Sequence, residues 1–126
     1  MKALTLRQPY AAAVVLGFKH IETRSWATSY RGPLWIHAAR GKPWPCSVSI
    51  PGDETAWRGM VLGRCQLVDV CPVEALRFSL SSRELALGDY ASGRYGWVLE
   101  DAELIDPWPA RGQLGLFVPI RDETVR

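Results

Sequence analysis

Charged side chains whose spacing suits ligand binding are concentrated between residues 17 and 26. Lys19, Glu22 and Arg24 place one anion between two cations, and Trp26 follows two residues later. The cations could neutralise a phosphate. The carboxylate could hold them in place, accept a hydrogen bond from a base amino group, or transfer a proton. These residue types therefore predict a site for an anionic ligand.

Whether these groups converge depends on the strand that follows Gly17. Alternation from residue 20 onward places Glu22, Arg24 and Trp26 on one face of that strand. Lys19 is out of phase with them, so it joins this face only if the chain kinks or the long side chain curls around. The alternative is a solvated edge strand, whose Glu22–Arg24 ion pair contributes less than about 1 kcal/mol.

An apolar segment from Pro9 to Leu16 precedes this strand and is typical of a helix that ends at Gly17. It is apolar nearly all round, so we expect it inside the core. Arg7 and Gln8 lie at its entrance, where free backbone N–H groups and the helix dipole favour an anion. Arg7 would add a guanidinium fork suited to phosphate, although a solvated strand-end arginine fits the same sequence.

The rest of the chain is predicted to be mainly strands, at residues 2–6, 34–39, 60–71, 96–105 and 114–120. Residues 41–59 predict an irregular loop with at most one helical turn, and 81–88 a short capped helix. An extended turn is expected at 106–109, and a bulge or close approach at Gly63. This order predicts an α+β fold: a small mixed β-barrel with short helices packed at its ends.

Three ring side chains outside the charged stretch have structural alternatives. Trp44 and Trp57, in the irregular loop, could stack on bases or could pin the loop onto the core. His37, on the strand predicted at 34–39, fits a hydrogen-bonded core histidine.

Four segments resemble, in order, the ASCH domain, which is part of the wider PUA-like superfamily. The central segment has the pattern Gly-x-Lys-x-x-Glu-x-Arg, from Gly17 to Arg24. The others are LTLRQPY at 4–10, RGPLWIHAA at 31–39 and GWVLE at 96–100. The similarity spans roughly residues 3–120. It implies a PUA-like barrel with a cleft, between the first helix and the barrel, that receives nucleic acid or a nucleoside.

This resemblance implies a nucleic-acid-binding domain whose partner is RNA or another single-stranded nucleic acid. The basic residues would neutralise phosphate and the aromatic residues would stack on bases. His37 would lie beside the cleft, as a neutral donor or acceptor. The expected nucleic-acid-binding residues are Arg7, Gln8, Lys19, Glu22, Arg24, Trp26, Tyr30, His37 and Trp97.

The alternative is a metal-independent hydrolase in the same cleft, with Lys19 and Glu22 as catalytic residues. Similar domains include ribonucleases and amidohydrolases that act on an acylated cytidine. The amidohydrolase type carries a threonine nucleophile three residues after the signature lysine, where this chain has Glu22. Thr23 would point to the opposite face of the strand, so this difference counts against deacylation. A sensor that binds a nucleoside-like small molecule without turnover is a third possibility.

The composition fits one soluble globular domain over residues 1–126, with 48% apolar residues. No apolar run approaches the ~20 residues that span a bilayer, so we expect a cytoplasmic protein without a membrane partner. Cys46, Cys65 and Cys71 are odd in number, form no Cys-x-x-Cys motif, and stand apart from both histidines. We therefore expect reduced thiols, no metal site and no cofactor.

Basic residues are concentrated in the first third of the chain. Residues 1–45 carry seven Lys or Arg and one acidic residue, a formal charge of +6, whereas the remainder carries −4. If these cations share a face, they form an electrostatic footprint for a polyanion; if they are scattered over the surface, they do not.

Overall fold

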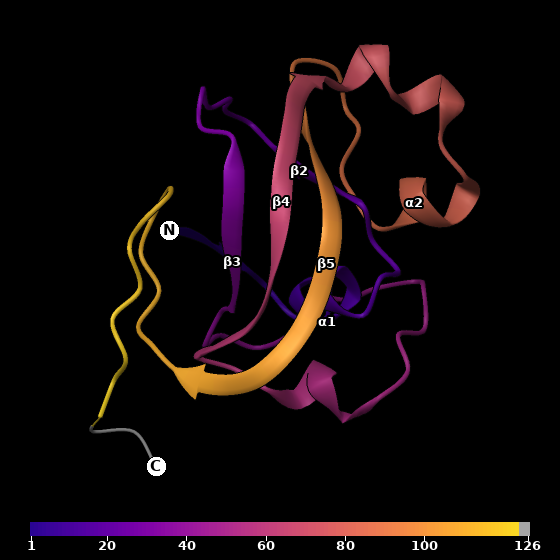
Figure 1. Cartoon of the computed structure of the whole chain (residues 1–126). Helices are drawn as coiled ribbons and strands as arrows, with labels where there is room; N and C mark the ends of the chain where they lie inside the picture. Colours follow the sequence, from indigo (N-terminus) through magenta and orange to yellow (C-terminus); the bar gives the residue numbers. More distant parts are fainter. Residues whose placement is uncertain (124–126) are drawn as a thin grey trace.

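The computed structural model describes residues 1–123, and its centre is a mixed five-stranded sheet that curls into a half-barrel (Figure 1). Along the sheet the strands follow the order β1-β3-β4-β5-β2. β1 pairs with β3 in parallel, and the other pairs are antiparallel. The strands are β1 (Lys2–Leu6), β2 (Ile21–Arg24), β3 (Gly32–Ala38), β4 (Met60–Pro72) and β5 (Tyr95–Pro109). The predicted α+β class is confirmed, and β1 and β2 form the two edges of the sheet.

Short helices surround this sheet. The α-helices are α1 (Tyr10–Val15) and α2 (Ser82–Ala86), and the 3-10 helices are η1 (Asp53–Ala56), η2 (Val73–Ala75) and η3 (Arg77–Ser79). α1 packs against β3, β4 and β5, and its residues 11–15 are buried, as its apolar sequence predicts. Gly17 follows with a φ of 83°, the left-handed conformation expected after a helix. Within the described residues, no helix has the length and apolar character that crossing a bilayer requires.

The core lies between α1 and the sheet. It includes three fully buried residues on one face of β3, Leu34, Ile36 and Ala38. Gly63 allows α1 to approach β4, because a Cβ atom there would lie 2.6 Å from Val15 Cγ1 and 2.2 Å from the Glu103 carbonyl oxygen. The close approach expected at this glycine is therefore present.

α2 is held against β2 by Glu84. Ser81 Oγ accepts a hydrogen bond from the Glu84 N–H at 3.1 Å, which is the predicted helix cap. The Glu84 carboxylate does not return to the cap residue; it accepts from the N–H groups of His20 at 2.9 Å and Ile21 at 3.4 Å. A helix distant in sequence is thereby fixed beside the start of β2.

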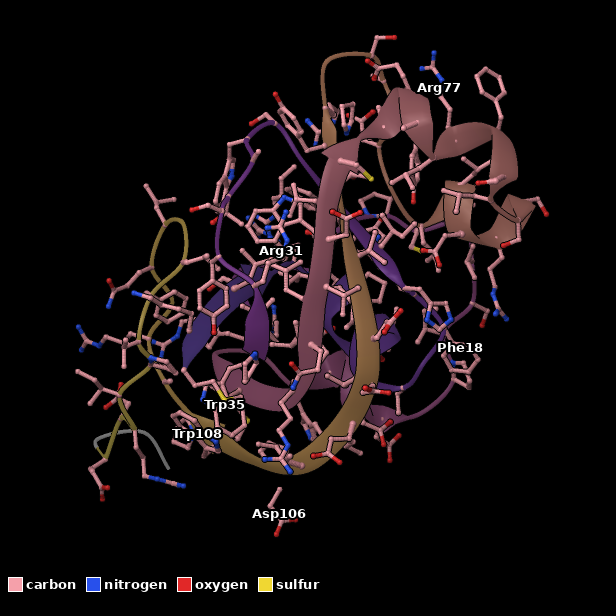
Figure 2. The ribbon with its side chains drawn as sticks, turned by 45° about the horizontal axis from the view of Figure 1, so that its top comes forward. Phe18, Arg31, Trp35, Arg77, Asp106 and Trp108 are labelled. Atoms are coloured by element: carbon pink, nitrogen blue, oxygen red, sulfur yellow. The ribbon has the colours of Figure 1, made fainter. Side chains whose placement is uncertain are left out.

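The expected turn at 106–109 is wrong, because β5 continues through this segment to Pro109 (Figure 1). Val61 pairs with Trp108 there, and the register shifts between Val61 and Gly63. Such an irregularity accommodates proline, which cannot donate to a regular ladder. Trp108 also meets the Trp35 ring, at 5.9 Å between centroids (Figure 2).

The strand expected at 114–120 is also wrong. The segment forms only an isolated bridge between Phe117 and Ala3. Gly115 adopts a φ of 69°, and Pro119 follows. A left-handed residue and a proline both interrupt regular pairing, so the apolar alternation does not produce a strand.

Candidate functional site

A cavity of about 590 Å³ lies where the two edges of the sheet approach each other. One wall comes from β1 and the loop after β3, and includes Thr5 and Trp44. The other comes from β2 and the end of α2, and includes Glu22 and Leu87. Residues 113–115 of the C-terminal segment also line the cavity. Its volume is within the ~300–1,000 Å³ range of small-ligand sites.

Glu22 lies between two cations on the β2 wall of this cavity. Its Oε1 is 3.5 Å from Lys19 Nζ and its Oε2 is 3.0 Å from Arg24 Nη2. The Glu22 side chain is 13% exposed, whereas Lys19 is only 1% exposed. The three signature residues therefore converge, and the partial burial of Glu22 and Lys19 distinguishes them from a surface ion pair.

Lys19 reaches Glu22 because the chain turns sharply after α1. The N–H groups of Phe18 and Lys19 both donate to the Ala13 carbonyl oxygen, at 2.8 and 3.0 Å. This turn replaces strand alternation, which begins only at Ile21. The kink on which the convergence depends is thus part of the helix end.

The Lys19 ammonium group also joins α1 to α2. Its Nζ donates to the carbonyl oxygen of Leu87, the residue that caps the C-terminus of α2. It also lies 5.7 Å from the centre of the Tyr10 ring. A cation is favourable at a helix C-terminus and over an aromatic face. Lys19 consequently fixes the wall beside Glu22 but lies below the cavity surface.

Arg24 bridges the two edges of the half-barrel. Its Nη2 donates to the carbonyl oxygen of Thr5, on β1, at 2.6 Å. Its Nε is buried and has no hydrogen-bond partner among the residues that the structure describes. Arg24 lines the cavity and its side chain is 24% exposed, so the exposed part of the guanidinium group is a candidate donor to a ligand.

Arg7 and Trp44 form a cation–aromatic pair at the cavity wall. The guanidinium carbon of Arg7 lies 5.2 Å from the centre of the Trp44 ring, and Trp44 is 58% exposed. Arg7 Nη1 donates to the Lys42 carbonyl oxygen at 3.2 Å. The backbone N–H of Trp44 donates to the Gln8 carbonyl oxygen at 2.8 Å, which fixes the loop. An exposed indole beside a guanidinium group is suited to base stacking.

Arg94 lies in the cavity lining as well, and it is not among the residues that the sequence predicts. Arg94 lines the opposite wall, where its Nη2 donates to the Thr23 carbonyl oxygen at 3.2 Å. Its Nε donates to the Asp89 carbonyl oxygen at 3.1 Å. The signal for Trp44 was its place in an irregular loop, but no local signal marks Arg94.

Gln8 does not face the cavity. It is fully buried, and its Nε2 donates to the carbonyl oxygens of Glu54 at 2.9 Å and Trp57 at 2.7 Å. Its Oε1 accepts from the Ala12 N–H at 3.1 Å, so this helical N–H group is satisfied internally. The side chain ties α1 to η1 and the residue that follows η1.

His37 is a buried, hydrogen-bonded histidine. Its Nε2 donates to the carbonyl oxygen of Ala110 at 2.7 Å, which leaves Nδ1 to accept from the Thr5 hydroxyl at 3.0 Å. Burial lowers the pKa of the imidazole below its ordinary value of 6.5. His37 thus connects β3 to β1 and to the C-terminal segment in the core.

The predicted aromatic residues Trp26, Tyr30 and Trp97 do not line the cavity. Trp97 is fully buried and meets the Trp26 ring edge-on, at 4.8 Å between centroids. Its Nε1 donates to the Trp26 carbonyl oxygen at 3.2 Å. The Tyr30 hydroxyl donates to the carbonyl oxygen of Pro33, on β3. Of the expected nucleic-acid-binding set, Arg7, Glu22 and Arg24 line the cavity, with Lys19 beneath them.

Cysteine and histidine do not assemble a metal centre in the described part of the chain. No group of three or more His, Cys, Asp or Glu there has an arrangement that could hold a metal ion. Cys46, Cys65 and Cys71 are free thiols, and burial raises the pKa of Cys65 to about 12.

Comparisons with known proteins support the same family by sequence and by fold. Residues 4–107 match the model of the ASCH domain. A segment of 46 residues is 50% identical to human activating signal cointegrator 1 and 48% identical to the mouse protein. That segment is 36% of this chain but 8% of either relative, so the chain corresponds to a small part of their length.

Crystal structures of ASCH from Zymomonas mobilis have a similar fold. One aligns with a TM-score of 0.58 and 24% identity, over 84% of this chain and 71% of that chain. A serine-to-alanine variant of the same protein aligns with a TM-score of 0.61 and 19% identity, over 97% and 89% of the two chains. Because the family model matches most of this chain, the chain belongs to the ASCH domain family, a family associated with RNA binding.

Proposed function

We propose that this chain binds single-stranded RNA through the cavity between β1 and β2. The observation that carries the proposal is the Arg7–Trp44 pair, which lies on one wall of a cavity whose other wall includes Glu22 and Arg24. Arginine contacts phosphate, an exposed indole stacks on a base, and a carboxylate accepts from a base amino group. These three kinds of contact are brought to one cavity.

The cavity suits an unpaired nucleotide. A base inside a duplex hides its face in the stack, whereas an unpaired base can stack on an aromatic side chain. Trp44 is exposed enough to offer a face. The family match adds support, because the ASCH family is associated with RNA binding.

The proposal is tested by RNA affinity in matched variants. We expect Arg7→Ala and Trp44→Ala to weaken binding of a labelled single-stranded oligonucleotide, measured by fluorescence anisotropy. The loss of stacking at Trp44 should cost about 1–3 kcal/mol. The loss at Arg7 should also reduce the salt dependence of binding, because one phosphate contact disappears.

A second cation–aromatic pair provides the control. Arg77 lies 5.5 Å from the centre of the Phe78 ring, on η3 (Figure 2). Phe78 is 90% exposed, and neither residue lines the cavity. Arg77→Ala and Phe78→Ala should bind RNA like the unmodified protein. Equal losses in both pairs would show that any surface cation or aromatic residue suffices, and would contradict the proposal.

A hydrolase in the same cavity is a second candidate, favoured by the Lys19–Glu22 contact of 3.5 Å. Glu22 lines the cavity and could serve as general acid or base. Labelled RNA or acylated cytidine, incubated with the protein in chelator, would yield product that disappears in Glu22→Gln. Thr23 is among the residues that line the cavity, but it is only 7% exposed and its hydroxyl oxygen accepts from the Asp89 N–H at 3.0 Å.

A further inference from the structure

We propose that the cavity holds a nucleotide that is still joined to a strand on both sides, with one flanking phosphate on the Arg7 wall and the other on the Arg94 wall. This inference rests on the proposed RNA binding and narrows its ligand. A free nucleoside monophosphate carries one phosphate, whereas a nucleotide within a strand has a phosphate on its 5′ side and another on its 3′ side. Two separate arginines therefore fit the second ligand better than the first.

The two arginines belong to different walls of the cavity. Arg7 follows β1 and is held by the Lys42 carbonyl oxygen and the Trp44 ring. Arg94 precedes β5 and is held by carbonyl oxygens of Thr23, on β2, and Asp89. β1 and β2 are the opposite edges of the sheet. A strand that crosses from one edge to the other would pass both guanidinium groups.

Arg94 is available to a phosphate despite its ion pair. Its Nε lies 3.5 Å from the Asp89 Oδ2, and the Asp89 side chain is 64% exposed. An exposed ion pair of this kind is weak in water, so a phosphate can replace the carboxylate. The backbone contacts to Thr23 and Asp89 hold the guanidinium group in place during that exchange.

Two exposed apolar side chains stand at the cavity where neighbouring bases would pass. Trp44 belongs to the loop after β3, and Leu114 belongs to the C-terminal segment and is 100% exposed. A fully exposed leucine has no packing role in the free protein. Contact with a base adjacent to the bound nucleotide would remove its surface from water. A free nucleotide, which has no neighbouring base, would leave Leu114 unused.

The β2 wall of the cavity is suited to the hydrogen-bonding edge of the enclosed nucleobase. Glu22 offers carboxylate oxygens, and the partly exposed guanidinium group of Arg24 offers N–H donors. An acceptor beside a donor matches the hydrogen-bonding edge of an unpaired base. The enclosed nucleotide thus places its base on Glu22 and Arg24 and its two phosphates on Arg7 and Arg94.

Three adenosine ligands separate this arrangement from a free-nucleotide site. They are adenosine 5′-monophosphate, adenosine with phosphates on both the 5′ and 3′ oxygens, and a pentanucleotide of adenylate, compared by calorimetry. We expect the bisphosphate to bind roughly tenfold tighter than the monophosphate, because it gains one charge-assisted contact. The pentanucleotide should bind tighter still.

Variants assign each contact. Arg94→Gln and Arg7→Gln should each weaken bisphosphate binding about tenfold. Leu114→Ser should weaken the pentanucleotide and leave the bisphosphate unchanged. Arg64→Gln is the control, since Arg64 is exposed, pairs with Glu103 and lies outside the cavity lining. Thermal unfolding of each variant establishes that it is folded.

Equal affinity for the three ligands, or unchanged bisphosphate binding in Arg94→Gln, would overturn this inference. Both results leave the proposed RNA binding intact, provided that the pentanucleotide binds and Trp44→Ala weakens it. A pentanucleotide that does not bind at all would instead contradict the proposed function, and with it this inference.

Discussion

Lys19 shows how a charged signature residue serves the site without reaching the ligand. Its ammonium group is buried between the Glu22 carboxylate and the Leu87 carbonyl oxygen. Burying a cation without partners costs free energy. Removing the cation also costs free energy, because its partners are then left buried and unpaired. The spacing of Lys19, Glu22 and Arg24 predicted that they could act together. It could not predict that Lys19 lies beneath the other two, because that depends on α2, more than sixty residues away along the chain.

Replacing Lys19 should therefore affect stability first. We expect Lys19→Ala to lower the free energy of unfolding by roughly 3 kcal/mol, the low end of the ~3–5 kcal/mol cost of breaking a buried pair. The low end applies because Glu22 is 13% exposed and keeps its contact with Arg24. Chemical denaturation measures this, with Lys42→Ala, an exposed lysine, as control. Lys19→Ala unfolding at the same denaturant concentration as the unmodified protein would contradict the structural role.

At the scale of elements, local patterns predicted the elements that carry the signature. β1, α1 and β2 follow from alternation, an apolar segment and a helix-ending Gly17. The incorrect predictions concern segments whose structure depends on pairing with distant strands. β5 extends through Pro109 because β4 pairs with it, and residues 114–120 remain irregular despite their apolar alternation. Periodicity reports which side chains could be buried, but not which backbone partner is present.

Gly63 tests how tightly α1 must pack on the sheet. We expect Gly63→Ala to lower the free energy of unfolding by about 1–3 kcal/mol, since its Cβ would overlap the Glu103 carbonyl oxygen, a backbone atom that cannot rotate away. Gly41→Ala is the matched control, because the new Cβ would meet only the end of the Arg7 side chain. Thermal denaturation compares the two. A destabilisation of Gly41→Ala as large as that of Gly63→Ala would contradict this account.

At the scale of the whole molecule, the basic first third of the chain is partly gathered and partly scattered. Arg7 and Arg24 line the cavity, but Arg31 lies 3.8 Å from Asp69, in an ion pair outside it (Figure 2). The rest of the lining includes residues 86–89, Arg94 and the C-terminal segment, which carry no recognisable signature. The sequence therefore predicted the part of the lining that lies on β2 and directly after β1. The remaining part of the lining is created by folding the ends of distant elements together.

The central claim is that RNA contacts the cavity between β1 and β2, and the tryptophan indole N–H signals test it directly. In nuclear magnetic resonance spectra of the six tryptophans, we expect the Trp44 indole signal to shift when single-stranded RNA is added. The signals of Trp35 and Trp108, which pack together outside the cavity lining, should remain unchanged. A shift of the Trp35 and Trp108 signals with an unaltered Trp44 signal would place the RNA elsewhere and contradict the account.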